Sequence, residues 1–143
     1  MFIGEYSYSL DDKKRLSVPL KFRDSLGKKA VVTRGLDQCL FMYSIKEWEV
    51  VAEKISKPSW VQADVRGFNR LMLAGAMEVS FDNLGRILIP DYLKSYALLK
   101  KKTAVIGVYN RIEIWDENKW QEYKEKTEKD VGDIAERLKE LGI

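Results

Sequence analysis

Histidine is absent from this 143-residue chain, and cysteine occurs only once. The lack of histidine excludes Ser-His-Asp and Cys-His catalytic triads, histidine zinc sites and imidazole acid–base chemistry. The single cysteine, Cys39, cannot form a disulfide within the chain and could supply at most one ligand to a metal. One unpaired cysteine is typical of a reducing compartment. We therefore expect a cytoplasmic protein that is not an enzyme and uses no cofactor or metal.

Long apolar runs are also missing. No segment approaches the ~18 consecutive apolar residues that a membrane helix needs. Residues 1–14 lack the order of a secretory signal, a basic segment followed by an apolar one. We expect no membrane partner. The 45% share of apolar residues is ordinary for a globular protein, and the length predicts one domain or two small fused halves.

The formal net charge of +3 hides an uneven distribution. Residues 1–43 are basic overall, whereas residues 116–143 are acidic. In residues 86–111 Asp91 is the only acidic side chain, and the basic ones are Arg86, Lys94, Lys100, Lys101, Lys102 and Arg111. Two basic segments that fold onto one face would form an electrostatic surface for a polyanion. On charge alone, however, a solvated surface that keeps the protein soluble is the favoured interpretation.

The chain contains an internal repeat. Ser9–Pro19 (SLDDKKRLSVP) aligns with Ser80–Pro90 (SFDNLGRILIP) at an offset of 71 residues, with Ser, Asp, Arg and Pro identical and the apolar positions kept. At an offset of 72 the match extends to the basic pairs Lys28-Lys29 and Lys100-Lys101. A fixed offset of this kind indicates two copies of one structural unit, each about 50 residues long.

Each copy predicts the same order of elements: strand, tight turn, strand ending at proline, short helix, two further strands and a helix. Ser44 and Glu47 have the spacing of a capping box, and Asp116 is placed to cap the final helix. The apolar stripe of residues 58–78 predicts a helix that packs on the core. The last segment is helical in composition, and Asp130–Gly132 is expected to break it into two helices.

The motif Asp-x-x-x-Arg occurs once in each copy, as Asp11–Arg15 and Asp82–Arg86. Three intervening residues suit a tight hairpin, with Asp and Arg at its two feet. An arginine held by such a pair keeps a fixed direction and can still present a planar fork to a guanine edge or a phosphate. The alternative is a salt bridge that only stabilises each hairpin, worth about 0–1 kcal/mol when exposed.

Three other functions stay open. A protein–protein module, antitoxin-like or scaffold, could bind a partner through its C-terminal helices without binding DNA. An enzyme based on carboxylates is disfavoured, because the adjacent Asp11 and Asp12 would point to opposite faces of a strand. RNA binding could use Phe2, Tyr6 and Tyr8 for base stacking, although one apolar face of a first strand explains these residues better.

The N-terminal sequence MFIGEYSYSLDDKKRLSVPLKFR and the second copy FDNLGRILIP together resemble the MraZ family of bacterial transcriptional regulators, over essentially the whole chain. The resemblance implies an α+β fold, a swapped-hairpin β-barrel of the AbrB type built from two internally repeated halves with peripheral helices. It also implies a nucleoid-associated repressor of the division and cell-wall gene cluster. Such a protein binds short direct repeats of double-stranded DNA as a ring-shaped homo-oligomer.

On this resemblance we divide the chain into a first half-barrel repeat (1–57), a connecting helix (58–78), a second half-barrel repeat (79–126) and a C-terminal helix (127–143). Asp11 and Asp82 are expected to orient the motifs. Lys14 stands where the second copy has Gly85, so the first turn needs either an uncommon backbone angle or a different shape. The DNA-binding candidates are Arg15 and Arg86 for base edges, and Lys13, Lys14, Lys21 and Arg23 for phosphates.

Overall fold

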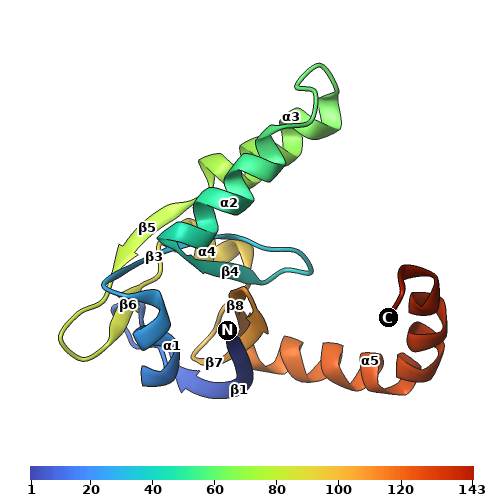
Figure 1. The fold of residues 1–143 in the computed structure, drawn as a ribbon. Coiled ribbons are helices and arrows are strands. Elements are labelled where there is room, and N and C mark those ends of the chain that lie inside the picture. The colour runs from blue at the N-terminus through green and yellow to red at the C-terminus, as the bar shows by residue number, and fades with distance from the viewer.

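The computed structural model describes all 143 residues and shows a mixed α+β protein, as the sequence predicts. Antiparallel strands form a six-stranded sheet and a separate two-stranded sheet, with the helices outside them (Figure 1). The strands are β1 (Phe2–Ser9), β2 (Arg15–Ser17), β3 (Lys29–Arg34), β4 (Leu40–Ser44), β5 (Met77–Ser80), β6 (Arg86–Leu88), β7 (Lys102–Tyr109) and β8 (Arg111–Asp116). The helices are α1 (Leu20–Leu26), α2 (Ile45–Ser56), α3 (Ala63–Asn69), α4 (Asp91–Tyr96) and α5 (Glu117–Leu138), with a π-helical turn η1 (Arg70–Ala74) and a 3-10 turn η2 (Lys139–Leu141).

Pairing between strands of different repeats holds the two copies together. β1 pairs with β7, β5 with β3, β4 with β8, and β2 with β6. The six-stranded sheet has the order β1-β7-β8-β4-β3-β5, so β1 and β5 are its edges and no pairing closes it into a barrel. Neither copy contains a complete sheet by itself, because each supplies the edge strand of the other.

The expected pairing of the two strands beside each Asp-x-x-x-Arg motif is wrong. β1 belongs to the large sheet, whereas β2 pairs only with β6 of the other copy. Only the turn itself is closed, by the backbone N–H of Asp11 donating to the carbonyl of Arg15 at 3.1 Å. The physical reason is burial, because the pairing of β2 with β6 places Leu16 opposite Ile87 and both side chains are fully buried there.

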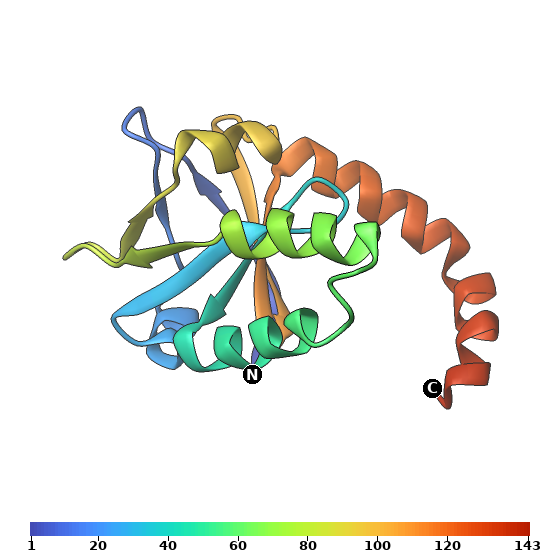
Figure 2. The ribbon, with the colours of Figure 1, turned by 90° about the horizontal axis from the view of Figure 1, so that it is seen from above.

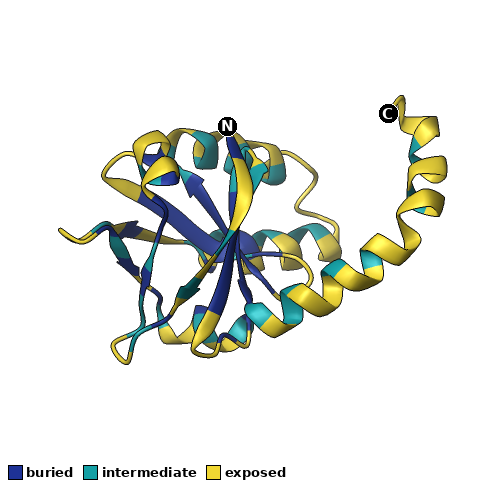
Figure 3. Ribbon diagram, turned by 90° about the horizontal axis from the view of Figure 1, so that it is seen from below, coloured by how far each residue is buried: buried dark blue, intermediate teal, exposed yellow.

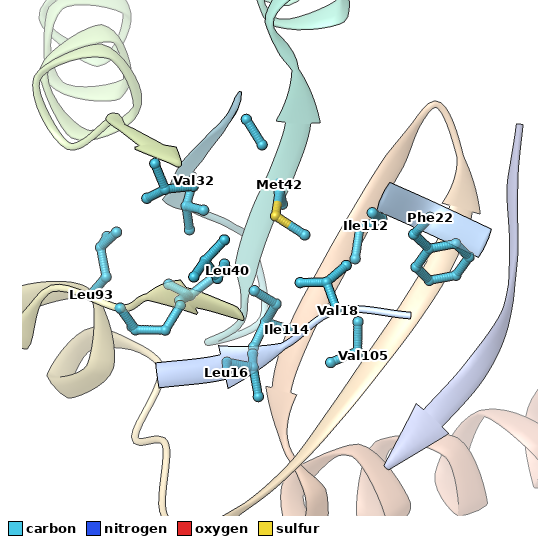
Figure 4. Close-up of a cluster of buried hydrophobic side chains, with 14 of the residues drawn as sticks. Leu16, Val18, Phe22, Val32, Leu40, Met42, Leu93, Val105, Ile112 and Ile114 are labelled. Carbon is cyan, nitrogen blue, oxygen red and sulfur yellow. The ribbon is translucent and has the colours of Figure 1, made fainter. Parts of the chain in front are cut away.

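The larger core lies between the six-stranded sheet and the layer formed by the β2–β6 pair with α1 and α4. Alternate residues of one strand face opposite sides of a sheet, so Leu40 and Met42 of β4 point into this core. Figure 4 shows them with Leu16, Val18 and Phe22, which come from β2 and the segment that follows it.

The aromatic residues of β1 belong to the same core. The rings of Phe2 and Tyr6 meet the edge of the Phe22 ring at centroid distances of 5.5 and 5.4 Å. Tyr8 also packs against this cluster. These contacts favour the apolar strand face over base stacking for Phe2, Tyr6 and Tyr8.

A second core covers the opposite face of the sheet, where α2, η1 and the start of α5 pack. Its buried members include Phe41 and Tyr43 of β4, in alternation with the residues that face the first core. Both predicted N-caps are present: Ser44 Oγ accepts from the N–H of Glu47 at 3.1 Å, and Asp116 Oδ2 accepts from the N–H of Lys119 at 3.2 Å. The caps fix where α2 and α5 leave the sheet.

The middle segment differs from its prediction. Its helix begins at Ala63 and not at Pro58, and it passes into the π-helical turn η1 before β5 begins. Met72 is buried and its carbonyl accepts from Thr33 Oγ1 at 2.7 Å. Trp60 is 74% exposed and Phe68 39%, so only the end of the segment packs on the core.

The C-terminal helix is one helix and not two. α5 runs through Asp130–Gly132 without a break, because the strong helix formers around Gly132 offset the roughly 1 kcal/mol that one glycine costs. Only its first turns touch the sheet, and the rest extends from the body and is mostly exposed (Figures 1 and 3). No helix of the structure has the length and hydropathy to span a membrane.

Candidate nucleic-acid interface

The first Asp-x-x-x-Arg turn is organised by the carboxylate of Asp11. Its Oδ1 accepts from the backbone N–H of Lys13 at 2.9 Å and of Arg15 at 2.8 Å, and its Oδ2 accepts from Arg15 Nε at 2.7 Å. The backbone bonds shape the turn, and the bond to Nε sets the direction of the guanidinium. The terminal nitrogens of Arg15 have no bonded partner in the structure, so the outer side of the fork is free.

The second turn repeats this arrangement. Asp82 Oδ1 accepts from the N–H groups of Leu84 and Arg86, both at 2.9 Å, and Oδ2 accepts from Arg86 Nε at 2.8 Å. Each distance agrees with its counterpart in the first turn to within 0.1 Å. The predicted pairing of Asp with Arg is therefore present in both copies.

An approximate two-fold axis relates the two turns. Leu16 and Ile87, equivalent at the offset of 71, lie opposite each other in the β2–β6 pair. The flanking bonds are equivalent as well: the N–H of Ile89 donates to the Lys14 carbonyl at 2.8 Å, and that of Val18 to the Gly85 carbonyl at 3.2 Å. The axis thus passes between Leu16 and Ile87 in the β2–β6 pair.

Near this axis, the Asp and Arg residues that begin and end the two turns lie close together. Arg86 Nη1 lies 3.8 Å from Asp11 Oδ2, so an arginine of one copy approaches the carboxylate of the other. The side chains of Arg15 and Arg86 are 34% and 24% exposed. The tips of the two turns, residues 12–14 and 83–85, project from the end of the molecule opposite α5, in diverging directions (Figure 2). The two arginines are therefore close neighbours on one accessible face.

Lys14 and Gly85 adopt the same backbone conformation. Their φ angles are +60° and +75°, both in the left-handed region. The first turn thus keeps the shape of the second although it has a lysine at this position. The Lys14 ammonium forms an ion pair with Asp91. The backbone N–H of Lys14 donates to the carbonyl of Asp11. Lys14 makes both contacts while its backbone is in the left-handed conformation.

Arg23 supports the second turn from α1. Its Nε donates to the carbonyl of Val18 at 3.0 Å. Its guanidinium lies against Gly85, where a Cβ atom would come within 2.6 Å of Arg23 Nε. The sequence suggests Arg23 as a phosphate contact, and the structure adds a positioning role that only the fold could show.

The carboxylates of both turns have pKa values below the ordinary value of an aspartate. The backbone N–H of Arg15 is the main cause that lowers the pKa of Asp11, and the Arg15 side chain adds to it. The backbone N–H of Arg86 and then its side chain lower the pKa of Asp82 in the same way. Lys14 lowers the pKa of Asp91 through a hydrogen bond and its charge. At neutral pH the arginines are therefore held by full negative charges.

Two pockets lie beside the equivalent helices α1 and α4. One, beside α1, has a volume of about 590 Å³, and its lining includes Arg23, Lys28, Lys29 and Asp82. The other, beside α4, has about 430 Å³ and includes Lys94 and Lys100. Lys28, Lys29 and Lys100 are not among the DNA-binding residues that the sequence suggests, although the repeated basic pair is a signal that points to them. Lys13 and Lys21 are exposed and make no ion pair.

Other chemistry finds little support in the structure. No three His, Cys, Asp or Glu side chains come close enough to hold a metal ion. Cys39 is buried, and this burial is the main cause that raises the pKa of its thiol. The Asp11 carboxylate is occupied by the turn, whereas Asp12 is exposed. The site offers paired guanidinium groups and lysines, which suit binding of a polyanion.

The chain is similar to known proteins over its whole length. A family model described as "MraZ protein, putative antitoxin-like" matches residues 1–71 and 72–141, so each match contains one Asp–Arg turn. The chain is 48% identical to the transcriptional regulator MraZ of Alkaliphilus metalliredigens and 48% identical to that of Caldicellulosiruptor saccharolyticus. It is 46% identical to that of Natranaerobius thermophilus. All three alignments cover the full length of both proteins.

Proposed function

The chain belongs to the MraZ family, and we propose that it is a sequence-specific DNA-binding transcriptional regulator. The observation that carries this proposal is the pair of equivalent Asp–Arg turns whose arginines lie close together and partly exposed. Each arginine donates from its Nε to the aspartate of its own turn, and its terminal nitrogens are available to bind a ligand. A bidentate arginine–guanine contact supplies roughly 1–3 kcal/mol of discrimination against a wrong base.

Phosphate contacts complete the proposed interface. Lys13 and Lys21 are exposed cations near the turns, and Lys14 and Arg23 lie beside them with one intramolecular partner each. Such contacts position the protein on the duplex without reading its sequence. Each neutralised phosphate releases counterions, so affinity falls with salt with a log–log slope of about −0.9 per phosphate.

We further propose that the assembled protein is a swapped-hairpin β-barrel of the AbrB type acting as a ring-shaped homo-oligomer, with half-barrel units 1–57 and 79–126. The exchange of edge strands between the repeats supports this architecture. A single protomer offers few base contacts and binds weakly. Several protomers on short direct repeats gain affinity through effective concentration. The proposed role is repression of the division and cell-wall gene cluster, in the cytoplasm at the nucleoid.

The test is DNA binding by matched variants. A duplex is first selected from a random pool with the unaltered protein. Arg15→Ala and Arg86→Ala should each weaken binding to it at least ten-fold, while Lys57→Ala, at the far end of α2, should not. Circular dichroism checks that the variants fold. Unchanged affinity in both arginine variants, or an affinity that does not respond to salt, would contradict the proposal.

A second candidate function is binding of a protein partner through α5. Most of this helix makes no contact with the body of the protein, and Val131 is 58% exposed. A stable protein partner recovered with the full chain, with no DNA selected from the pool, would favour this function over DNA binding.

A further inference from the structure

The tips of the two turns differ in chemistry although their backbones match. At the offset of 71, Lys13 corresponds to Leu84, and Lys14 corresponds to Gly85. The first tip therefore carries two cations, one of them paired with Asp91. The second tip carries no charged side chain between Asp82 and Arg86. The second turn therefore has no cation at its tip to attract phosphate.

Leu84 is the only apolar side chain between Asp82 and Arg86. Its side chain is 70% exposed, at a type of position that polar residues and glycine usually occupy. Its backbone is nonetheless fixed, since its N–H donates to Asp82 Oδ1 at 2.9 Å. The same oxygen binds the N–H of Arg86 at 2.9 Å. Leu84 is therefore held in register with Arg86 by a shared carboxylate.

We propose that Leu84 is a specificity-determining residue that packs against the 5-methyl group of a thymine in the major groove. The inference rests on the proposed function, because it places Leu84 next to a base contact of Arg86. In the major groove, thymine is the base that presents a methyl group, and apolar side chains recognise it by contact. Burial of an otherwise exposed leucine against this methyl is favourable without any charge.

The two turns then read DNA differently. Lys13, at the place equivalent to Leu84, contributes a charge that phosphate attracts, and it adds affinity for any sequence. Leu84 adds affinity only where a thymine stands at one position. A protomer with nearly two-fold turns thus recognises a site whose two halves are unlike, and the protein lies on DNA in one orientation.

The experiment removes the methyl group alone. In the duplex selected by the unaltered protein, each thymine is replaced in turn by deoxyuridine, and binding is measured by fluorescence anisotropy. At one position the replacement should weaken binding by the unaltered protein about four-fold, the effect of one methyl group. The same replacement should not change binding by Leu84→Ala. Lys13→Ala is the matched control: it should keep the full response to deoxyuridine and reduce the salt slope by about one.

The outcomes separate this inference from the proposed function. Selection of no duplex at all overturns the proposed function. If a duplex is selected and Arg86→Ala weakens its binding, but Leu84→Ala responds to deoxyuridine as the unaltered protein does, only the role of Leu84 is overturned. Light scattering of Leu84→Ala gives a further check, because a changed assembly mass would place Leu84 at a contact between subunits and overturn its role in reading thymine.

Discussion

Gly85 is the position where a single methyl group should disturb the site most. Its φ of +75° lies in the left-handed region, which costs an L-residue about 1–2 kcal/mol. A Cβ atom there would lie 2.6 Å from both Nε and Nη1 of Arg23. The guanidinium must then move and give up its 3.0 Å bond to the Val18 carbonyl, worth about 1 kcal/mol. Gly85→Ala should therefore lower the free energy of unfolding by about 2–3 kcal/mol.

Two further variants isolate the two causes. Lys14→Gly, at the equivalent place, relieves a left-handed lysine but loses the exposed ion pair with Asp91 and gives the unfolded chain more freedom. These effects offset one another, so stability should change by less than about 1 kcal/mol. In an Arg23→Ala background no guanidinium is displaced, and Gly85→Ala should cost only the roughly 1–2 kcal/mol of the backbone angle.

The assay is urea unfolding at one fixed protein concentration, followed by the fluorescence of the four tryptophans. A cost below about 0.5 kcal/mol for Gly85→Ala would refute the strain argument. An equal cost with and without Arg23 would show that Arg23 does not support the turn.

Three smaller predictions follow from the same geometry. Because the pKa values of Asp11 and Asp82 are lowered from 3.8, the stability that the two carboxylates contribute is present above pH 3.8 and is lost as the pH falls through their folded pKa values. Carbon-detected NMR titration should show both carboxyls titrating below 3.8. Arg15→Ala should return the pKa of Asp11 only part of the way towards 3.8, because the hydrogen bond from the backbone N–H of residue 15 remains. Leu16→Ala, on the two-fold axis and fully buried, should cost about 2–5 kcal/mol in urea unfolding, whereas Leu88→Ala in β6, 58% exposed, should cost under about 1 kcal/mol. Ser44→Ala should lower the melting temperature through the loss of the α2 cap, by an amount equivalent to about 1 kcal/mol, and an unchanged melting temperature would mean that the cap is dispensable.

Local chemistry explains what the sequence predicts correctly. The alternation in β4 predicts its two apolar faces, and the spacing of Ser44 and Glu47 predicts the start of α2, because both depend on neighbours along the chain. The repeat predicts an Asp–Arg turn in each copy, but it leaves the shape of the first turn open, because Lys14 disfavours the left-handed angle that Gly85 adopts easily. The structure shows that Lys14 adopts this angle as well.

Two of the features that the sequence could not predict are interactions between distant residues, and one is a local preference that its neighbours override. The apolar pattern of β2 predicts a strand but not its partner, so the sequence alone could not assign β2 to β6. Gly132 suggests a break that the surrounding helix formers override. The contact of Arg23 with Gly85 joins residues of different repeats. No local pattern could reveal it.

Fusion of the two repeats in one chain bears directly on the proposed way of reading DNA. If two identical copies formed the same unit as a homodimer, symmetry would make both tips identical and the preferred site palindromic. Within one chain each tip can change alone, because Lys13 and Leu84 are exposed and support nothing in the fold. Leu16 and Ile87 on the axis are fully buried and cannot vary so freely. Exchanging Lys13 and Leu84 should therefore redirect base preference without loss of stability. The variant Leu84→Lys, in which both tips carry a lysine at this place, should lose the preference for one orientation on DNA.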